Sequence, residues 1–169
     1  PPVIYSLPNV LDGGLRIGMF RDSDPRRFNG NIQDLKIING IGRDQAFTII
    51  DPFAPTTKAE LEAAVAAWTE SPAAASSTYG HISTWDTINI TDMSFLFSNN
   101  YFFNEDIGSW NVSNVTNMER TFISTWRFNQ NLNGWDVSKV TNIASMFREA
   151  MHFNQPLDKW NVSSVTEFG

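Results

Sequence analysis

The chain contains no cysteine and little charge, and these two shortages exclude several kinds of protein. Because none of the 169 residues is Cys, disulfide bonds, thiolate metal sites and cysteine nucleophiles are all excluded. Charged residues make up only 18% and the formal net charge is −6, which argues against the clustered Lys and Arg of a nucleic-acid-binding surface. No apolar run reaches the length of about 18 residues that a membrane span needs, so we expect no membrane insertion.

Signatures of catalysis are also missing. His81 and His152 are the only histidines and lie far apart, and no His/Asp/Glu group has the spacing of a metal site. The sequence carries no P-loop, dinucleotide fingerprint or G-x-S-x-G motif. We therefore expect a protein that is not an enzyme and has no bound metal or other cofactor, calcium being the one exception considered below.

What the sequence does contain is an internal repeat of 25 residues, marked by Trp85, Trp110, Trp135 and Trp160. Further apolar positions recur at the same interval: Val112/Val137/Val162, Ile90/Val115/Val140/Val165, Met93/Met118/Ile143/Phe168, Phe97/Phe122/Phe147, Phe103/Phe128/Phe153 and Ile107/Leu132/Leu157. One repeat cannot bury these side chains alone, whereas stacked repeats would join them into a continuous core.

Each repeat has two segments with a local pattern. The β-branched stretch typified by Val137–Val140 predicts one short strand, and the spacing of Met93 and Phe97 predicts a helical turn. Strands in successive repeats would be parallel, joined by right-handed connections. We therefore expect 81–169 to form a right-handed α/β repeat solenoid of three full repeats and one partial repeat.

Two columns raise the question of a binding site. Asn104, Asn129 and Asn154 recur without exception; we interpret them as a structural ladder that satisfies backbone groups in a turn, and ligand contact is the alternative. Tyr101, Trp126 and Met151 share a column beside the Phe residues. They belong either to the core or to an exposed stripe that binds a partner or a sugar ring.

The segment 51–80 is predicted to hold a linker and a capping helix. Thr57 and Glu60 have the spacing of a capping box, and Leu61 and Trp68 fall on one helical face. We expect this helix to cover the first repeat, followed by a loop formed by SPAAASSTYG.

The repeats resemble the BspA-type leucine-rich repeat family, which includes mycoplasma lipoprotein-like surface proteins. Residues 135–157 match the pattern W-[DN]-V-S-x-V-T-N-M-x-x-M-F-x-x-A-x-x-F-N-Q-x-L almost throughout, with Ile143 in place of the first Met, and the likeness covers about 81–169. The resemblance implies a leucine-rich-repeat-like fold, a secreted or cell-surface location and a role in adhesion or surface architecture. It supplies no catalytic residues.

The 25-residue repeat does not extend into the first fifty residues. Strands are predicted at 15–18 and 31–38, and the run Phe28-Asn29-Gly30 followed by Ile32, Asp34, Leu35 and Ile37 resembles the last strands of a concanavalin-like or laminin-G-like sandwich. Fifty residues are too few for a whole sandwich, so we expect the rest either in a longer chain or in a neighbouring one. Four aspartates could form a weak calcium rim, turn formation being the alternative: Asp12, Asp22, Asp24 and Asp34.

Four sequons provide glycosylation candidates at Asn89, Asn111, Asn114 and Asn161. Together with the repeat, they favour a non-enzymatic extracellular structural or adhesion module. We expect it to be part of a larger surface protein or filament, packing against other protein chains or copies of itself. The alternative is a carbohydrate-binding receptor module of the cell surface.

Overall fold

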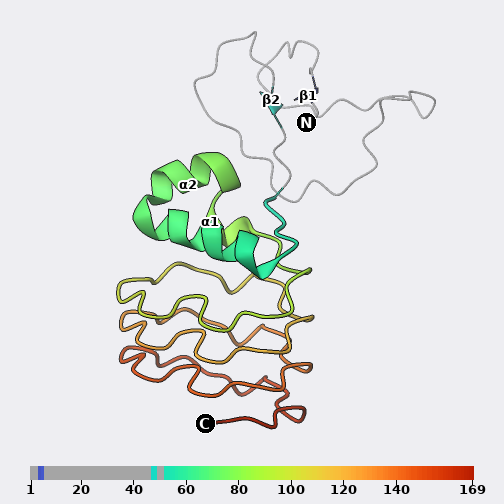
Figure 1. Cartoon of the computed structure of the whole chain (residues 1–169), viewed down its shortest axis with the longest axis vertical. Helices are drawn as coiled ribbons and strands as arrows, with labels where there is room; N and C mark the ends of the chain where they lie inside the picture. Colours follow the sequence, from blue (N-terminus) through green and yellow to red (C-terminus); the bar gives the residue numbers. More distant parts are fainter. Residues whose placement is uncertain (1–3, 6–46, 49–51) are drawn as a thin grey trace, which may run out of the picture. The chain divides into compact units, whose positions relative to one another are not determined.

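The computed structural model describes residues 4–5, 47–48 and 52–169, and the chain divides into two units, Pro1–Asp51 and Pro52–Gly169 (Figure 1). In the first unit, β1 (Ile4–Tyr5) pairs with β2 (Phe47–Thr48) in antiparallel register, Ile4 opposite Thr48. The strands predicted at 15–18 and 31–38, the sandwich-like motif and the four aspartates of the calcium rim lie outside the described residues.

The second unit begins with helix α1 (Lys58–Glu70), and its capping box is confirmed. The hydroxyl of Thr57 accepts the backbone N–H of Glu60 at 3.2 Å, and the Glu60 carboxylate accepts the backbone N–H of Thr57 at 3.2 Å. Two otherwise unpaired donors of the first turn are thereby satisfied. The hydrogen bonds from Thr56 and Thr57 lower the pKa of Glu60.

Residues 71–80, predicted to be a loop, form a second helix instead. Helix α2 (Pro72–Tyr79) follows α1 after the single residue Ser71, and a short 3₁₀ helix, η1 (Ile82–Thr84), leads into the repeats. Pro72 stands at the start of α2, where its missing N–H costs nothing, and three alanines follow it. The loop prediction was wrong because it took the small residues as a sign of a loop packed against the helix end, although Ala is the strongest helix former.

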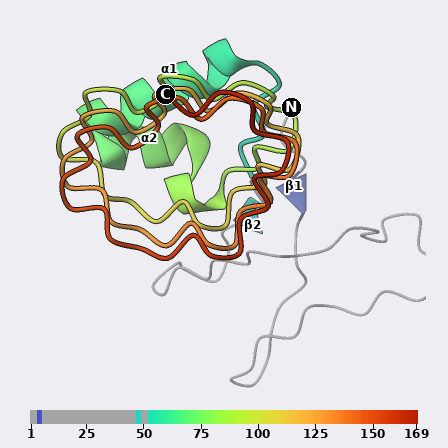
Figure 2. The ribbon, with the colours of Figure 1, turned by 90° about the horizontal axis from the view of Figure 1, so that it is seen from below.

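The repeats form a stack of closed, irregular coils that lie over one another, as the view from below shows (Figure 2). Parallel bridges one residue wide join successive coils, from Asp92 to Asn117, from Asn117 to Asn142 and from Asn142 to Glu167. In residues 52–169 these isolated bridges are the only β pairing, and no strand forms. The predicted α/β repeat solenoid, with a strand and a helical turn in every repeat, is therefore wrong.

The predicted strands are replaced by tight turns. At Val137–Val140 the N–H of Val140 donates to the carbonyl of Val137 at 2.9 Å, which closes a β-turn. Asp136 holds this turn because its Oδ1 accepts the N–H of Ser138 at 3.1 Å, and the repeat places Asp or Asn at the same point in each coil. A short polar side chain that bonds the backbone two residues ahead favours a turn over a strand, and here it overrides the preference of the β-branched residues.

The predicted helical turn is also absent, because the backbone N–H groups alternate between two kinds of partner. Leu96 donates within its own coil to the carbonyl of Met93 at 3.2 Å, whereas Phe97 donates to Thr121 of the next coil at 2.9 Å. Phe95 has φ +62°, which no right-handed helix permits. The spacing of Met93 and Phe97 thus arises from successive turns, and every second N–H is left to tie the coils together.

The core runs through the stack as columns of aromatic rings. Phe97 and Phe122 stack with ring centroids 5.3 Å apart, and Phe122 and Phe147 stack at 5.4 Å, both nearly parallel. A second column consists of Trp85, Trp110, Trp135 and Trp160, whose indole N–H groups donate to backbone carbonyls; Trp110, for example, donates to the carbonyl of Ile82 at 2.8 Å. The stacking predicted from the Trp and Phe spacing is what the structure shows, although the backbone that carries it differs.

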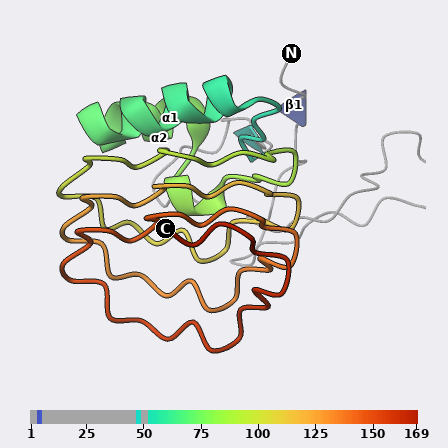
Figure 3. The same cartoon turned by 60° about the horizontal axis from the view of Figure 1, so that its bottom comes forward.

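Helix α1 lies across one end of the stack (Figure 3). Lys58 donates to the hydroxyl of Ser94 at 2.6 Å and to the carboxylate of Asp92 at 3.3 Å, and Asn100 donates to the hydroxyl of Thr69 at 2.7 Å. Both ends of α1 are therefore fixed to the first coil by polar contacts. None of the helices in the described part of the chain is long and apolar enough to cross a membrane.

Candidate interaction surface

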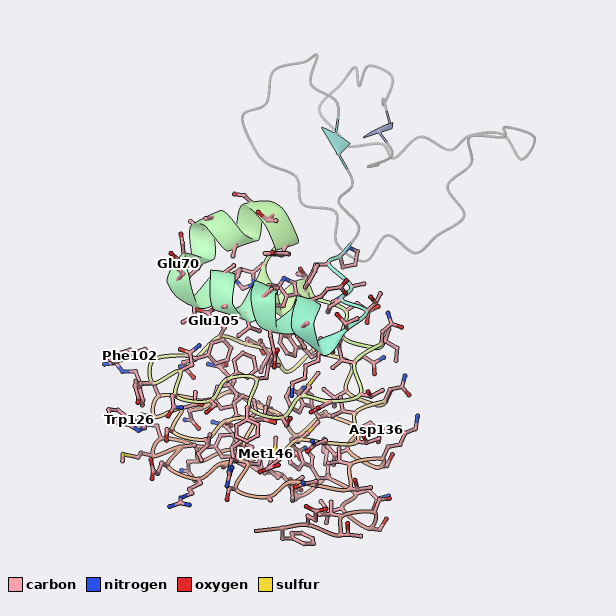
Figure 4. The ribbon with its side chains drawn as sticks, viewed as in Figure 1. Glu70, Phe102, Glu105, Trp126, Asp136 and Met146 are labelled. Atoms are coloured by element: carbon pink, nitrogen blue, oxygen red, sulfur yellow. The ribbon has the colours of Figure 1, made fainter. Side chains whose placement is uncertain are left out.

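One edge of the stack carries large apolar side chains that stay exposed. Tyr101 is 40% exposed, Trp126 41% and Met151 72%, and Phe102 beside them is 72% exposed. Figure 4 shows Phe102 and Trp126 pointing outward at the same side of the coils. The stripe of Tyr101, Trp126 and Met151 therefore lies on the surface and does not belong to the core, which was one of the two interpretations that the sequence left open.

Backbone hydrogen bonds hold this stripe in place. The N–H of Arg127 donates to the carbonyl of Tyr101 at 3.1 Å, and the N–H of His152 donates to the carbonyl of Trp126 at the same distance. The Nδ1 of His152 also lies 2.6 Å from the carbonyl oxygen of Trp126, which adds a second contact between the same two residues. Successive coils thus present their exposed side chains in fixed register.

The exposed rings contact one another as well. The centroids of Tyr101 and Trp126 are 4.5 Å apart with their planes tilted by 43°, so each ring covers part of one face of the other. The guanidinium of Arg127 lies 5.4 Å from the centroid of Phe102, within reach of a cation–π interaction. These contacts limit the rotamers that the side chains can adopt.

A shallow groove of about 520 Å³ runs beside the stripe, between α1 and the first coil. Glu62, Thr69 and Glu70 line it from the helix, and Ser98 and Tyr101 line it from the coil. The two carboxylates make this end of the surface acidic. Arg127 in the second coil and Arg148 in the third are exposed and add positive charge there.

The Asn column lies in the turn between coils and bonds the backbone there. The Oδ1 of Asn104 accepts the N–H of Asn129 at 2.8 Å, and the Oδ1 of Asn129 accepts the N–H of Asn154 at 2.9 Å. Gln130 adds a bond from its Nε2 to the carbonyl of Asn104 at 2.9 Å. The amide oxygens of Asn104 and Asn129 thus link successive coils.

The four sequons differ in their surroundings. Asn89, Asn111 and Asn161 are exposed, whereas Asn114 is half-buried. The Nδ2 of Asn114 donates to the carbonyl of Ile88 at 2.9 Å, and its Oδ1 accepts from Lys139 at 2.7 Å. A glycan on Nδ2 of Asn114 would compete with the hydrogen bond to Ile88. The three exposed asparagines are therefore the better candidates for glycosylation.

Acidic side chains in the coils stabilise turns by accepting the backbone N–H two residues ahead. Partial burial opposes ionisation of Asp92, but hydrogen bonds from Ser94 and Lys58 outweigh it and lower the pKa of this carboxyl. Hydrogen bonds from Ser138 lower the pKa of Asp136 in the equivalent way. Within 4–5, 47–48 and 52–169, no group of three or more His, Asp or Glu side chains converges as a metal site.

Sequence reasoning missed the second row of the surface, formed by Phe102, Arg127 and His152, and the carboxylates of α1 beside it. The signal was available, because these three residues follow the stripe by one position in every repeat. It was overlooked because their types differ, and a column of mixed residues does not stand out as a pattern. The acidic end, formed by Glu62 and Glu70, could not be predicted because it depends on where α1 packs.

The stacked 25-residue coils define the chain as a tandem-repeat protein. A family model described as "Mycoplasma protein of unknown function, DUF285" matches residues 66–169, and the chain belongs to that family. The description of the family mentions neither BspA nor leucine-rich repeats. The curated proteins and the solved structures yield no match to the chain.

Proposed function

We propose that this protein is a non-enzymatic structural or adhesion module of the cell exterior that works by packing against other protein chains. The observation that carries the proposal is the exposed stripe of Tyr101, Trp126 and Met151, with Phe102 and Arg127 beside it. Tyr, Trp, Phe, Met and Arg are the residue types enriched at protein–protein contacts, where a few large side chains supply most of the binding energy.

The rigidity of the stack supports the same function. Because the carbonyls of Tyr101 and Trp126 are bonded to the next coil, the stripe loses little backbone freedom when a partner covers it. The repeat also extends the surface in one direction, which suits contacts along a filament or layer.

The extracellular location rests on the resemblance of the repeats to BspA-type surface proteins and on the exposed sequons. Asn89, Asn111 and Asn161 leave their amides accessible at the surface of the stack. We propose that the chain acts within a larger surface protein or filamentous assembly.

Carbohydrate binding is the second candidate function. The Tyr101–Trp126 ring pair provides aromatic surface, and the neighbouring Asn99 and His152 are exposed polar groups. Sugars stack on open ring faces, however, and each ring of this pair covers part of the other. Packing against a protein, which also buries ring edges, therefore fits the geometry better.

Attachment of the fluorescent full-length chain to the cells that produce it tests the proposal. We expect attachment that disappears in the variant Y101S/W126S/M151S and persists in F95S, which removes an exposed ring from a different column. Trypsin treatment of the cells should abolish attachment, and glycosidase treatment should not. The opposite enzyme pattern would favour the carbohydrate alternative, and equal attachment by both variants would contradict a role for the stripe.

A further inference from the structure

The interaction surface carries opposite charges at its two ends. Glu62 and Glu70 mark the end at α1, where Glu62 lies 3.8 Å from the ammonium group of Lys58, and Arg127 and Arg148 mark the second and third coils. Within the part of the chain that the structure describes, no carboxylate lies within ion-pair distance of Arg127, and Arg148 meets only its neighbour Glu149, at the 4.0 Å limit. The positive end is thus only partly neutralised within its own chain.

The order of groups along the surface makes it self-complementary. From α1 downward it runs from carboxylates to Tyr101 and Phe102, then to Trp126 and Arg127, and last to Arg148. A two-fold axis perpendicular to the stack, passing between the first and second coils, brings each group of one copy opposite its counterpart in the other. Tyr101 then faces Trp126, Phe102 faces Arg127, and the carboxylates of α1 face Arg148 of the third coil, as an isologous interface requires.

We propose that the partner of this surface is a second copy of the chain, packed face to face with its stack running antiparallel. The inference rests on the proposed function, since it names the protein that covers the stripe. A parallel arrangement would place the carboxylates of the two copies together and the guanidinium groups together, and like charges across an interface oppose association. Charge therefore selects the antiparallel arrangement, while the aromatic groups supply the contact.

Charge reversal at each end provides the test, by sedimentation of the full-length chain over a range of concentrations. The acidic-end variant is E62R/E70R and the basic-end variant is R148E; all three side chains are exposed, so the fold should survive, as circular dichroism checks. We expect wild type to dimerise and each variant alone to dissociate, with a Kd raised at least tenfold. In the equimolar mixture every reversed end meets an end of opposite sign, so heterodimers should form with a Kd close to that of wild type.

The mixture separates a specific interface from a general loss of stability. Rescue in the mixture, together with a wild-type dimer that weakens as salt is added, supports the antiparallel pair. Wild type that stays monomeric, variants that dimerise as wild type does, or a mixture that stays monomeric would each overturn it. If the copies do not pair but attachment to cells still depends on the stripe, the proposed function stands and the partner is a different chain.

Discussion

Two columns of the stack follow the same 25-residue spacing, but the side chains of one face the core and those of the other face solvent. Phe97, Phe122 and Phe147 face inward, and their rings stack into the core. Tyr101, Trp126 and Met151 begin only four residues further along each coil and face outward. The period therefore predicts which residues lie above one another, whereas the path of the turn decides whether they are buried.

Truncation of one ring in each column should show the largest difference. Phe122→Ala removes a fully buried ring that stacks on both Phe97 and Phe147, and we expect a loss of about 4 kcal/mol in the free energy of unfolding. Trp126→Ala removes a larger but exposed side chain and should cost about 1 kcal/mol, mainly from its contact with Tyr101. Urea unfolding measures both, and equal losses would contradict the assignment of inside and outside.

The residue columns could be predicted from the sequence, whereas the backbone conformation that carries them could not. The Trp and Phe columns and the capping box followed from spacing, because stacking and capping depend on residues at fixed intervals. The predicted strand and helical turn did not form. The hydrogen bond from Ser138 to the side chain of Asp136 favours a turn over a strand, and the left-handed conformation of Phe95 interrupts any helix.

The exposed surface was only half predictable. Tyr101, Trp126 and Met151 were visible as a column, but their burial depended on turns that the pattern did not reveal. The acidic end depends on Glu62 and Glu70, which only the packing of α1 brings to the first coil.

Hydroxyl groups provide a smaller test of the same inside–outside difference. Thr125 is buried and donates to the carbonyl of Phe97 at 3.1 Å, whereas Thr141 is exposed and donates to Thr116 at the same distance. Replacement by the isosteric Val should cost about 1 kcal/mol at Thr125 and at most about 0.5 kcal/mol at Thr141, where water replaces the lost partner. The free energies of unfolding of the two variants measure this difference. A larger loss at Thr141 than at Thr125 would contradict the assignment of Thr125 to the core and Thr141 to the surface.

The contact between α1 and the first coil should give the smallest effect, and one that depends on pH. The pKa of Asp92 is lowered in the folded chain, so its charge stabilises the fold above the unfolded pKa of about 3.9 and this contribution is lost as the pH falls through the folded pKa. Asp92→Asn keeps the turn, since Asn117 and Asn142 hold the equivalent positions, but it removes the charge opposite Lys58.

We therefore expect wild type to be more stable than Asp92→Asn near pH 6, with the difference shrinking below about pH 4. Thermal unfolding at a series of pH values measures it. A difference that grows as the pH falls would contradict the stabilising role of the charged carboxylate.

The central claim is that Tyr101, Trp126 and Met151 serve contact with other chains and not the core, and sedimentation of the full-length Y101S/W126S/M151S variant beside its urea unfolding tests it most directly. We predict that the variant is monomeric where wild type associates, while its free energy of unfolding falls by no more than about 2 kcal/mol, the sum expected for one exposed ring contact and two surface substitutions. A variant that still associates as wild type does, or that no longer folds, would contradict the account.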